Sequence, residues 1–165
     1  MRTTFAALAL LALAGCGGTD DTSSAASETP AMAEQTAAVK GAEITLTSVE
    51  ETAQIGDEGI LPPAGDGETY IVAHFSVKNT GNKPLAFTGE PTLNLVDGKG
   101  QAYEQDVVTS AFVASSADPS GFASGINPGT SKKSGAVWKV AKKAYDPTAW
   151  KLVTYAKPKH EFKLN

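Results

Sequence analysis

The chain has 165 residues, 41% of them hydrophobic, and a formal net charge of −4 at pH 7. This length and balance suit one domain with a hydrophobic core. Arg2 is the single arginine, which disfavours planar, bidentate recognition of phosphate. Because the net charge is also negative, we expect no nucleic-acid partner.

The first residues carry the parts of an export signal. Met1 and Arg2 supply positive charge, an apolar stretch runs from Phe5 to Leu13, and small residues follow it. The stretch falls short of the roughly 20 residues that a transmembrane helix needs. We therefore expect residues 1–15 to be a signal peptide that is removed, and Arg2 with it.

Leu13-Ala14-Gly15-Cys16 closely resembles the lipobox of bacterial lipoprotein precursors. The resemblance implies cleavage between Gly15 and Cys16, a diacylglycerol on the Cys16 sulfur and usually an acyl chain on its amine. At about 0.8 kcal/mol per buried methylene, several chains anchor a protein stably to a membrane. The expected location is the bacterial cell envelope. Gly17 stands where an inner-membrane retention signal commonly has Asp, which in a Gram-negative cell favours the outer membrane, on its periplasmic or surface face.

We expect residues 16–41 to be a lipidated N-terminus followed by a disordered tether. From Gly17 to Gly41 the chain has no aromatic and almost no large aliphatic side chain. Such a segment buries too little apolar surface to offset the entropy of ordering its backbone. A coil of this length would hold its cargo on the order of 30 Å from the bilayer.

The rest of the chain, residues 42–165, has the periodicity of β-strands. Apolar and mostly polar side chains alternate from Tyr70 to Lys78, and shorter alternating runs occur around residues 44–47, 93–95, 136–140 and 150–155. Turns rich in Asn, Gly and Pro separate these runs, and no segment keeps a helical period over more than about two turns. The pattern predicts an all-β, antiparallel β-sandwich. Cys16 is the only cysteine, so packing has to stabilise this domain without disulfides.

Three segments, taken in order, point to a known family. They are a strand and Asn-Thr-Gly turn at residues 70–85, a hairpin at residues 95–103, and a turn and strand at residues 126–140. Together they resemble the telokin-like, immunoglobulin-type domains of many bacterial lipoproteins, a family known as a domain of unknown function. The resemblance implies an immunoglobulin-like sandwich, and that family carries no agreed catalytic residues. The Pro62-Pro63 loop and the stretch from Thr109 to Gly125 depart from the pattern.

The residue inventory argues against catalysis. His74 and His160 are the only imidazole bases, and no serine lies in a Gly-x-Ser-x-Gly turn. The alternation predicts that His74 is an ordinary, exposed strand residue. With two histidines and no thiol in the domain, a transition-metal site of the common kinds is disfavoured. We expect a protein that is not an enzyme and holds no cofactor.

Calcium is the alternative metal, because it takes oxygen ligands from loops. The loop before the strand at residue 70 carries four acidic side chains, Asp57, Glu58, Asp66 and Glu68. The loop lacks the alternating acids and closing Glu of an EF-hand. These four residues are weak calcium candidates, and a solvated acidic loop is the simpler interpretation.

Charge divides the chain. Residues 42–106 hold mostly acids, whereas residues 107–165 hold mostly lysines. Lysines gathered on one face could engage an anionic lipid or polymer. A sandwich interleaves early and late strands, so we expect mutual neutralisation between neighbouring strands.

Two functions remain in view. The favoured one is a lipid-anchored, non-catalytic binding or scaffold module for an envelope or extracellular protein, with the loops at residues 52–68 and 106–128 as candidate contact surfaces. The alternative is a carrier of a small ligand or calcium, which would need a concave site with convergent polar groups.

Overall fold

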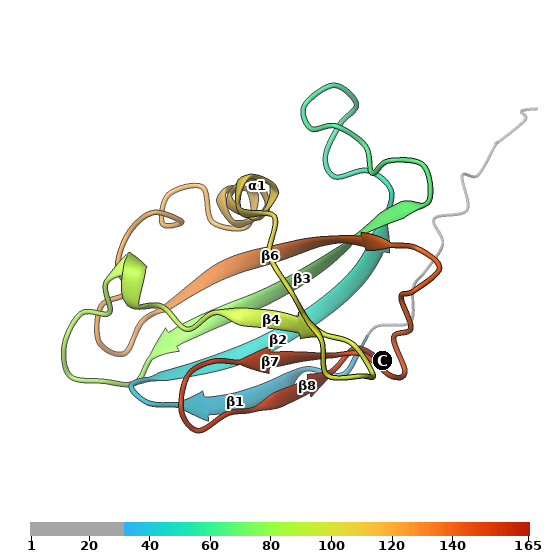
Figure 1. The fold of residues 1–165 in the computed structure, drawn as a ribbon. Helices are drawn as coiled ribbons and strands as arrows, with labels where there is room; N and C mark the ends of the chain where they lie inside the picture. The colour runs from blue at the N-terminus through green and yellow to red at the C-terminus, as the bar shows by residue number, and fades with distance from the viewer. Residues whose placement is uncertain (1–31) are drawn as a thin grey trace, which may run out of the picture.

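The computed structural model describes residues 32–165, and these form two four-stranded antiparallel sheets packed face to face (Figure 1). The first sheet has the order β1-β2-β3-β6 and the second the order β5-β4-β7-β8. The elements in chain order are β1 Gln35–Val39, β2 Ala42–Thr52, β3 Glu68–Asn79, η1 Phe87–Gly89, β4 Leu93–Val96, β5 Ala102–Tyr103, α1 Val107–Ala117, β6 Ser131–Ala141, β7 Lys151–Thr154 and β8 Glu161–Lys163. The predicted β-sandwich is therefore confirmed, with one helix added.

Strand β3 is buried on both of its faces. The alternating side chains of Ile71 and Phe75 point between the sheets into the main core, as the sequence pattern predicts. The opposite face is only partly as expected, since Tyr70 is 2% exposed there and Val72 is buried beside it. Val72 lies beside α1, which packs over β6 on the outer face of the first sheet (Figure 1). The Tyr70 hydroxyl donates to the Pro62 carbonyl at 3.2 Å in the loop before β3.

Helix α1 corrects the expectation that no helix would form. Asp106 caps it, and its side chain accepts a hydrogen bond from the Thr109 backbone N–H at 3.0 Å. The helix has no clean apolar stripe, and Val113 is its only buried large hydrophobic residue, which is why the helical period is invisible in the sequence. Gly135 of β6 allows the close approach, because a Cβ there would lie 2.3 Å from Cγ1 of Val113.

The predicted start of the folded domain at residue 42 is wrong. Strand β1 lies inside the segment assigned to the tether and pairs with β2 from Gln35 to Val39. The Gln35 side chain also donates to the Lys163 backbone carbonyl and accepts from the Lys163 N–H, both at 2.8 Å. Gln35 thus joins the edge of the first sheet to β8, the edge of the second, and closes one side of the sandwich.

Asn79 connects two of the three segments that carry the family resemblance, the turn after residue 79 and the turn that begins at residue 126. Its buried side-chain amide donates to the carbonyls of Lys83 and Ile126 at 2.8 and 2.7 Å, and its carbonyl oxygen accepts from the Gly81 N–H at 2.9 Å. One side chain therefore holds both the turn after β3 and the loop before β6. The Asn-Thr-Gly turn has a structural role in this chain.

The expected neutralisation between early and late strands is observed for two ion pairs. Glu68 of β3 lies 3.7 Å from Lys139 of β6, and Glu90 binds Lys132 of β6. Each pair joins the acidic half of the chain to the basic half.

Candidate functional site

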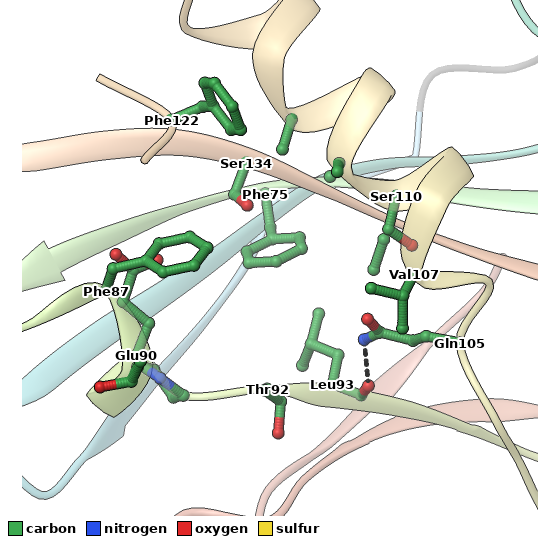
Figure 2. Close-up of a pocket in the computed structure, with 16 residues that line it drawn as sticks. Phe75, Phe87, Glu90, Thr92, Leu93, Gln105, Val107, Ser110, Phe122 and Ser134 are labelled. Carbon is green, nitrogen blue, oxygen red and sulfur yellow. Dashed lines mark hydrogen bonds between the residues drawn. The ribbon is translucent and has the colours of Figure 1, made fainter. Parts of the chain in front are cut away.

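An apolar groove opens on the side of the sandwich that β1 and β8 do not close (Figure 2). It lies between α1, the η1–β4 segment and β6, and its volume is about 320 Å³. Phe75, Leu93 and Ala136, all buried core residues, form its floor. The remaining lining mixes apolar and polar residues, and its largest apolar side chains are Phe87, Pro91, Val107 and Phe122.

The rim of the groove exposes large hydrophobic side chains. Phe87 is 53% exposed and Val107 is 74% exposed, from opposite sides of the opening. Leaving such side chains in water costs free energy, and contiguous exposed apolar surface beside a concavity is typical of binding sites.

The edge of β6 supplies polar backbone groups to the groove. At Val137 the edge is capped, because its N–H donates to Ser110 Oγ and its carbonyl accepts from the Asp106 N–H, both at 2.8 Å. In an antiparallel pair, alternate residues turn their N–H and C=O to the same side. Gly135, two residues before Val137 and a lining residue of the groove, therefore directs its backbone groups away from β3.

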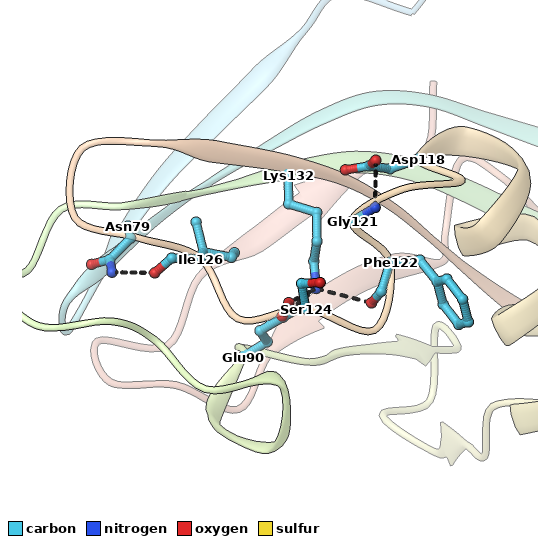
Figure 3. Close-up of polar contacts among 8 residues, drawn as sticks. All are labelled: Asn79, Glu90, Asp118, Gly121, Phe122, Ser124, Ile126 and Lys132. Carbon is cyan, nitrogen blue, oxygen red and sulfur yellow. Dashed lines mark hydrogen bonds and ion pairs between the residues drawn. The ribbon is translucent and has the colours of Figure 1, made fainter.

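A buried ion pair holds the aromatic rim in place (Figure 3). Lys132 is 5% exposed, and its ammonium binds the Glu90 carboxylate and donates to the carbonyls of Phe122 and Ser124 at 3.1 and 3.2 Å. The ammonium also lies 5.2 Å from the centroid of the Phe87 ring, a distance that suits a cation–π contact. Lys132 thus connects β6 to both segments that carry the rim phenylalanines.

Burial raises the pKa of the Glu90 carboxyl, and the hydrogen bond and charge of Lys132 oppose that rise. The pair is desolvated but fully hydrogen-bonded on the lysine side. Its contribution is to position the rim, since a buried pair gives little net stability relative to apolar residues.

The family model for the domain of unknown function DUF4352 matches residues 32–155. This chain belongs to the DUF4352 family. A curated relative, the uncharacterized protein YxkC of Bacillus subtilis, is 31% identical over 112 residues, which are 67% of this chain and 62% of YxkC. The chain therefore spans less than two thirds of that relative.

Two solved structures share the fold. A conserved hypothetical protein from Bacillus anthracis has a TM-score of 0.69 at 24% identity, covering 81% of this chain and 95% of its own. An uncharacterized beta-sandwich protein from Clostridium difficile 630 has a TM-score of 0.53 at 16% identity, covering 79% and 90%. At these identities the likeness is one of fold.

The two histidines of this DUF4352 domain lie far from each other in the fold, and each contacts a different part of the first sheet. His74 Nε2 is 3.4 Å from Glu50 Oε1 on the outer face of the first sheet, with 37% of its side chain exposed. It borders two further hollows on this face, with volumes of about 310 and 630 Å³. His160 Nε2 lies 2.9 Å from the Ala38 carbonyl oxygen and helps hold the C-terminal segment against β1. The groove contains neither residue.

The acidic loop does not assemble a calcium site in the DUF4352 domain. Glu68 accepts a hydrogen bond from the Gly65 N–H at 3.2 Å and pairs with Lys139, while Asp57, Glu58 and Asp66 are exposed. Within residues 32–165, no three Asp, Glu, His or Cys side chains lie where they could hold a metal ion.

The predicted cleavage and lipidation residues, Gly15 and Cys16, lie outside the described residues. Over residues 32–165, no helix combines the length and hydrophobicity needed to cross a membrane. The groove residues Phe87 and Phe122 were missed by sequence reasoning. Their one signal is that they are large aromatic side chains in otherwise polar loops.

Proposed function

We propose that this protein is a lipid-anchored, extracytoplasmic module of the immunoglobulin-like, telokin-like type, whose groove binds an extended, apolar segment of an envelope protein. The exposed Phe87 and Val107 beside a preformed apolar groove carry this proposal. The lipobox at Cys16 supports the anchoring, and the antiparallel sandwich supports the fold subtype.

The polar features of the groove favour a polypeptide over a purely apolar ligand. Gly135 turns its backbone N–H and C=O away from β3 at a buried position beside α1, and groups of this kind match the backbone of an added strand. The rim phenylalanines would take its apolar side chains. Extended peptides bind sheet edges in this way, with backbone hydrogen bonds for affinity and pockets for specificity.

A small apolar ligand is the second candidate. The groove volume of about 320 Å³ stands at the lower end of the roughly 300–1,000 Å³ of ligand pockets. Native mass spectrometry of the protein purified from its own cells distinguishes the two. A stoichiometric bound small molecule that disappears on Phe75→Trp, which fills the groove floor, would favour the carrier.

The chain offers a matched pair of residues for testing the groove. Val107 and Val108 are both 74% exposed at the start of α1, but only Val107 lines the groove. We expect Val107→Asp to abolish in-cell crosslinks that a photoreactive residue at position 87 makes to a partner protein. Val108→Asp should leave them intact, because the added charge then lies outside the groove. Equal loss in both variants would refute the groove as the contact surface.

Anchoring is tested separately with Cys16→Ala. The variant should move from the membrane fraction to the soluble fraction. If the partner is reached only at the membrane, the variant should also lose its crosslinks. If Cys16→Ala stays in the membrane fraction, the lipid anchor is excluded while the groove proposal stands.

A further inference from the structure

One end of the sandwich gathers exposed lysines from parts of the chain that are distant in sequence. This lysine end, defined by Lys40, Lys78, Lys83, Lys157 and Lys159, lies at the left of Figure 1, where the β1–β2 turn, the end of β3 and the β7–β8 loop meet. All five side chains are exposed. None of them forms an ion pair within residues 32–165.

Backbone hydrogen bonds fix these loops to one another. The Lys40 N–H donates to the Lys157 carbonyl at 2.9 Å, and the Thr80 N–H donates to the Gly41 carbonyl at 3.1 Å. Asn79 holds the Lys83 carbonyl at 2.8 Å. The lysines therefore project from a rigid platform, so their backbone positions need no further ordering when an anion binds.

The lysine end is nearly free of compensating acids. Glu43 lies opposite Lys78 in the β2–β3 register, and Glu161 beyond Lys159 is already paired with Lys151 at 2.9 Å. At the other end of the sandwich, Asp57, Glu58 and Asp66 are exposed in the loop before β3. That end also carries the exposed Lys142 and Lys143, so its charges are mixed, whereas the lysine end is mainly positive.

We propose that the lysine end binds an anionic polymer that carries repeated phosphate groups. Lysine ammonium groups act as mobile point charges and tolerate many phosphate geometries, and the described residues contain no arginine that would impose a bidentate one. Five lysines spread over several loops match a chain of charges better than a single phosphate does. This binding is additional to that of the groove and does not depend on it.

The direction of β1 favours a free polymer over a membrane surface as the ligand of the lysine end. Strand β1 runs from Gln35 toward the turn at Lys40 and Gly41. Residues 32–34, which precede β1, therefore lie on the side opposite the lysine end. An anchor on the N-terminal side, as in the proposed function, would leave the lysines facing away from the membrane.

The test measures binding of fluorescently labelled long-chain inorganic polyphosphate to the full-length protein by anisotropy, as a function of salt. For about four neutralised phosphates, counterion release predicts that affinity falls about 50-fold between 50 and 200 mM salt. Monomeric phosphate at the same total phosphate concentration should not compete.

Two double variants remove the same charge from opposite ends. Lys157→Gln with Lys159→Gln should weaken polyphosphate binding on the order of 50-fold at 50 mM salt and flatten the salt dependence. Lys142→Gln with Lys143→Gln is the control, because the Lys142 N–H bonds to the Gly67 carbonyl at 2.9 Å and so places both lysines at the other end. Lys40→Gln with Lys83→Gln should reproduce the first result through different loops.

Three outcomes would overturn the proposal. They are no binding of polyphosphate, an equal loss in the control variant, which would show an effect of net charge alone, and tighter binding to phosphatidylglycerol vesicles than to polyphosphate. The last outcome would assign the lysine end to a membrane surface. None of the three bears on the groove, whose test is crosslinking at position 87.

Discussion

Val113 of α1 rests directly on Gly135 of β6, with only 2.3 Å between its Cγ1 atom and the place where a Cβ of residue 135 would stand. The glycine therefore sets the distance between helix and sheet, and with it the width of the groove that α1 borders.

Replacing this glycine should separate the helix from the sheet. Gly135→Ala forces Val113 and α1 to shift, and overpacking of this kind costs about 1–3 kcal/mol. Urea denaturation should show this loss. Gly89→Ala is the control, because the nearest atom to its added Cβ, Leu85 Cδ1, is 3.8 Å away. An unchanged midpoint for Gly135→Ala would mean that α1 adjusts freely.

The Lys132–Glu90 pair should show strong coupling. Lys132→Met leaves Glu90 without its partner at a site where 12% of the Glu90 side chain is exposed, and we expect a loss of about 2–4 kcal/mol. Adding Glu90→Gln to that variant should recover a large part of the loss, because no buried charge then remains. A double-mutant cycle in chemical denaturation measures the coupling, and additive effects would contradict it.

Alkaline pH should destabilise the fold through Tyr145. Burial, aided by the negative charges of Glu51 and Asp146, raises the pKa of its phenol from 10.0 to about 12. Between these values the unfolded chain releases the proton and the folded chain keeps it, so stability is intact below pH 10 and falls as pH rises from 10 to 12.

The loss through Tyr145 is about 1–2 kcal/mol after allowance for partial exposure. Tyr145→Phe keeps the edge-on contact with Trp150, whose ring centroid lies 5.4 Å away. Thermal unfolding scans should therefore show a smaller decline for Tyr145→Phe than for the wild type in this window. Equal declines would assign the effect to other groups.

Strand β1 should be needed for stability. A chain that begins at residue 42 loses the buried side chains Ala37 and Val39 and both Gln35 bonds, and should be less stable than one that begins at residue 32 by about 3 kcal/mol or more. It also exposes the β2 edge to other chains. Thermal unfolding and light scattering of the two forms provide the comparison. Similar behaviour would restore residue 42 as the boundary.

The strands were predictable where one face meets the core and the other meets water. Phe75 and Val77 alternate with polar neighbours and lie where the pattern places them. Helix α1 escaped notice because its contact with the sheet depends on a glycine in β6, which no local period reveals. Strand β1 was not predicted because its side chains are mostly small. Its position is determined by backbone pairing with β2 and by the hydrogen bond between Gln35 and Lys163, which the sequence pattern does not show.

The candidate site was predictable only in outline. The loop at residues 106–128 was expected to be a contact surface, and it supplies Val107 and Phe122 to the groove. Phe87 comes from a different segment, and Lys132 connects the two by binding both Glu90, 42 positions earlier in the sequence, and the Phe122 carbonyl. Which segments meet in this way depends on the topology of the fold, and the local pattern of a single sequence does not reveal it.

The position of β1 also determines how the domain would resist a pull. Force that arrives along this strand from the preceding residues acts on its five pairings with β2 and on both Gln35 bonds at the same time. Bonds loaded together in shear fail together, whereas bonds opened from one end fail singly. The force needed to unfold the domain from this side would therefore depend on β1, a strand of five residues at the edge of the first sheet.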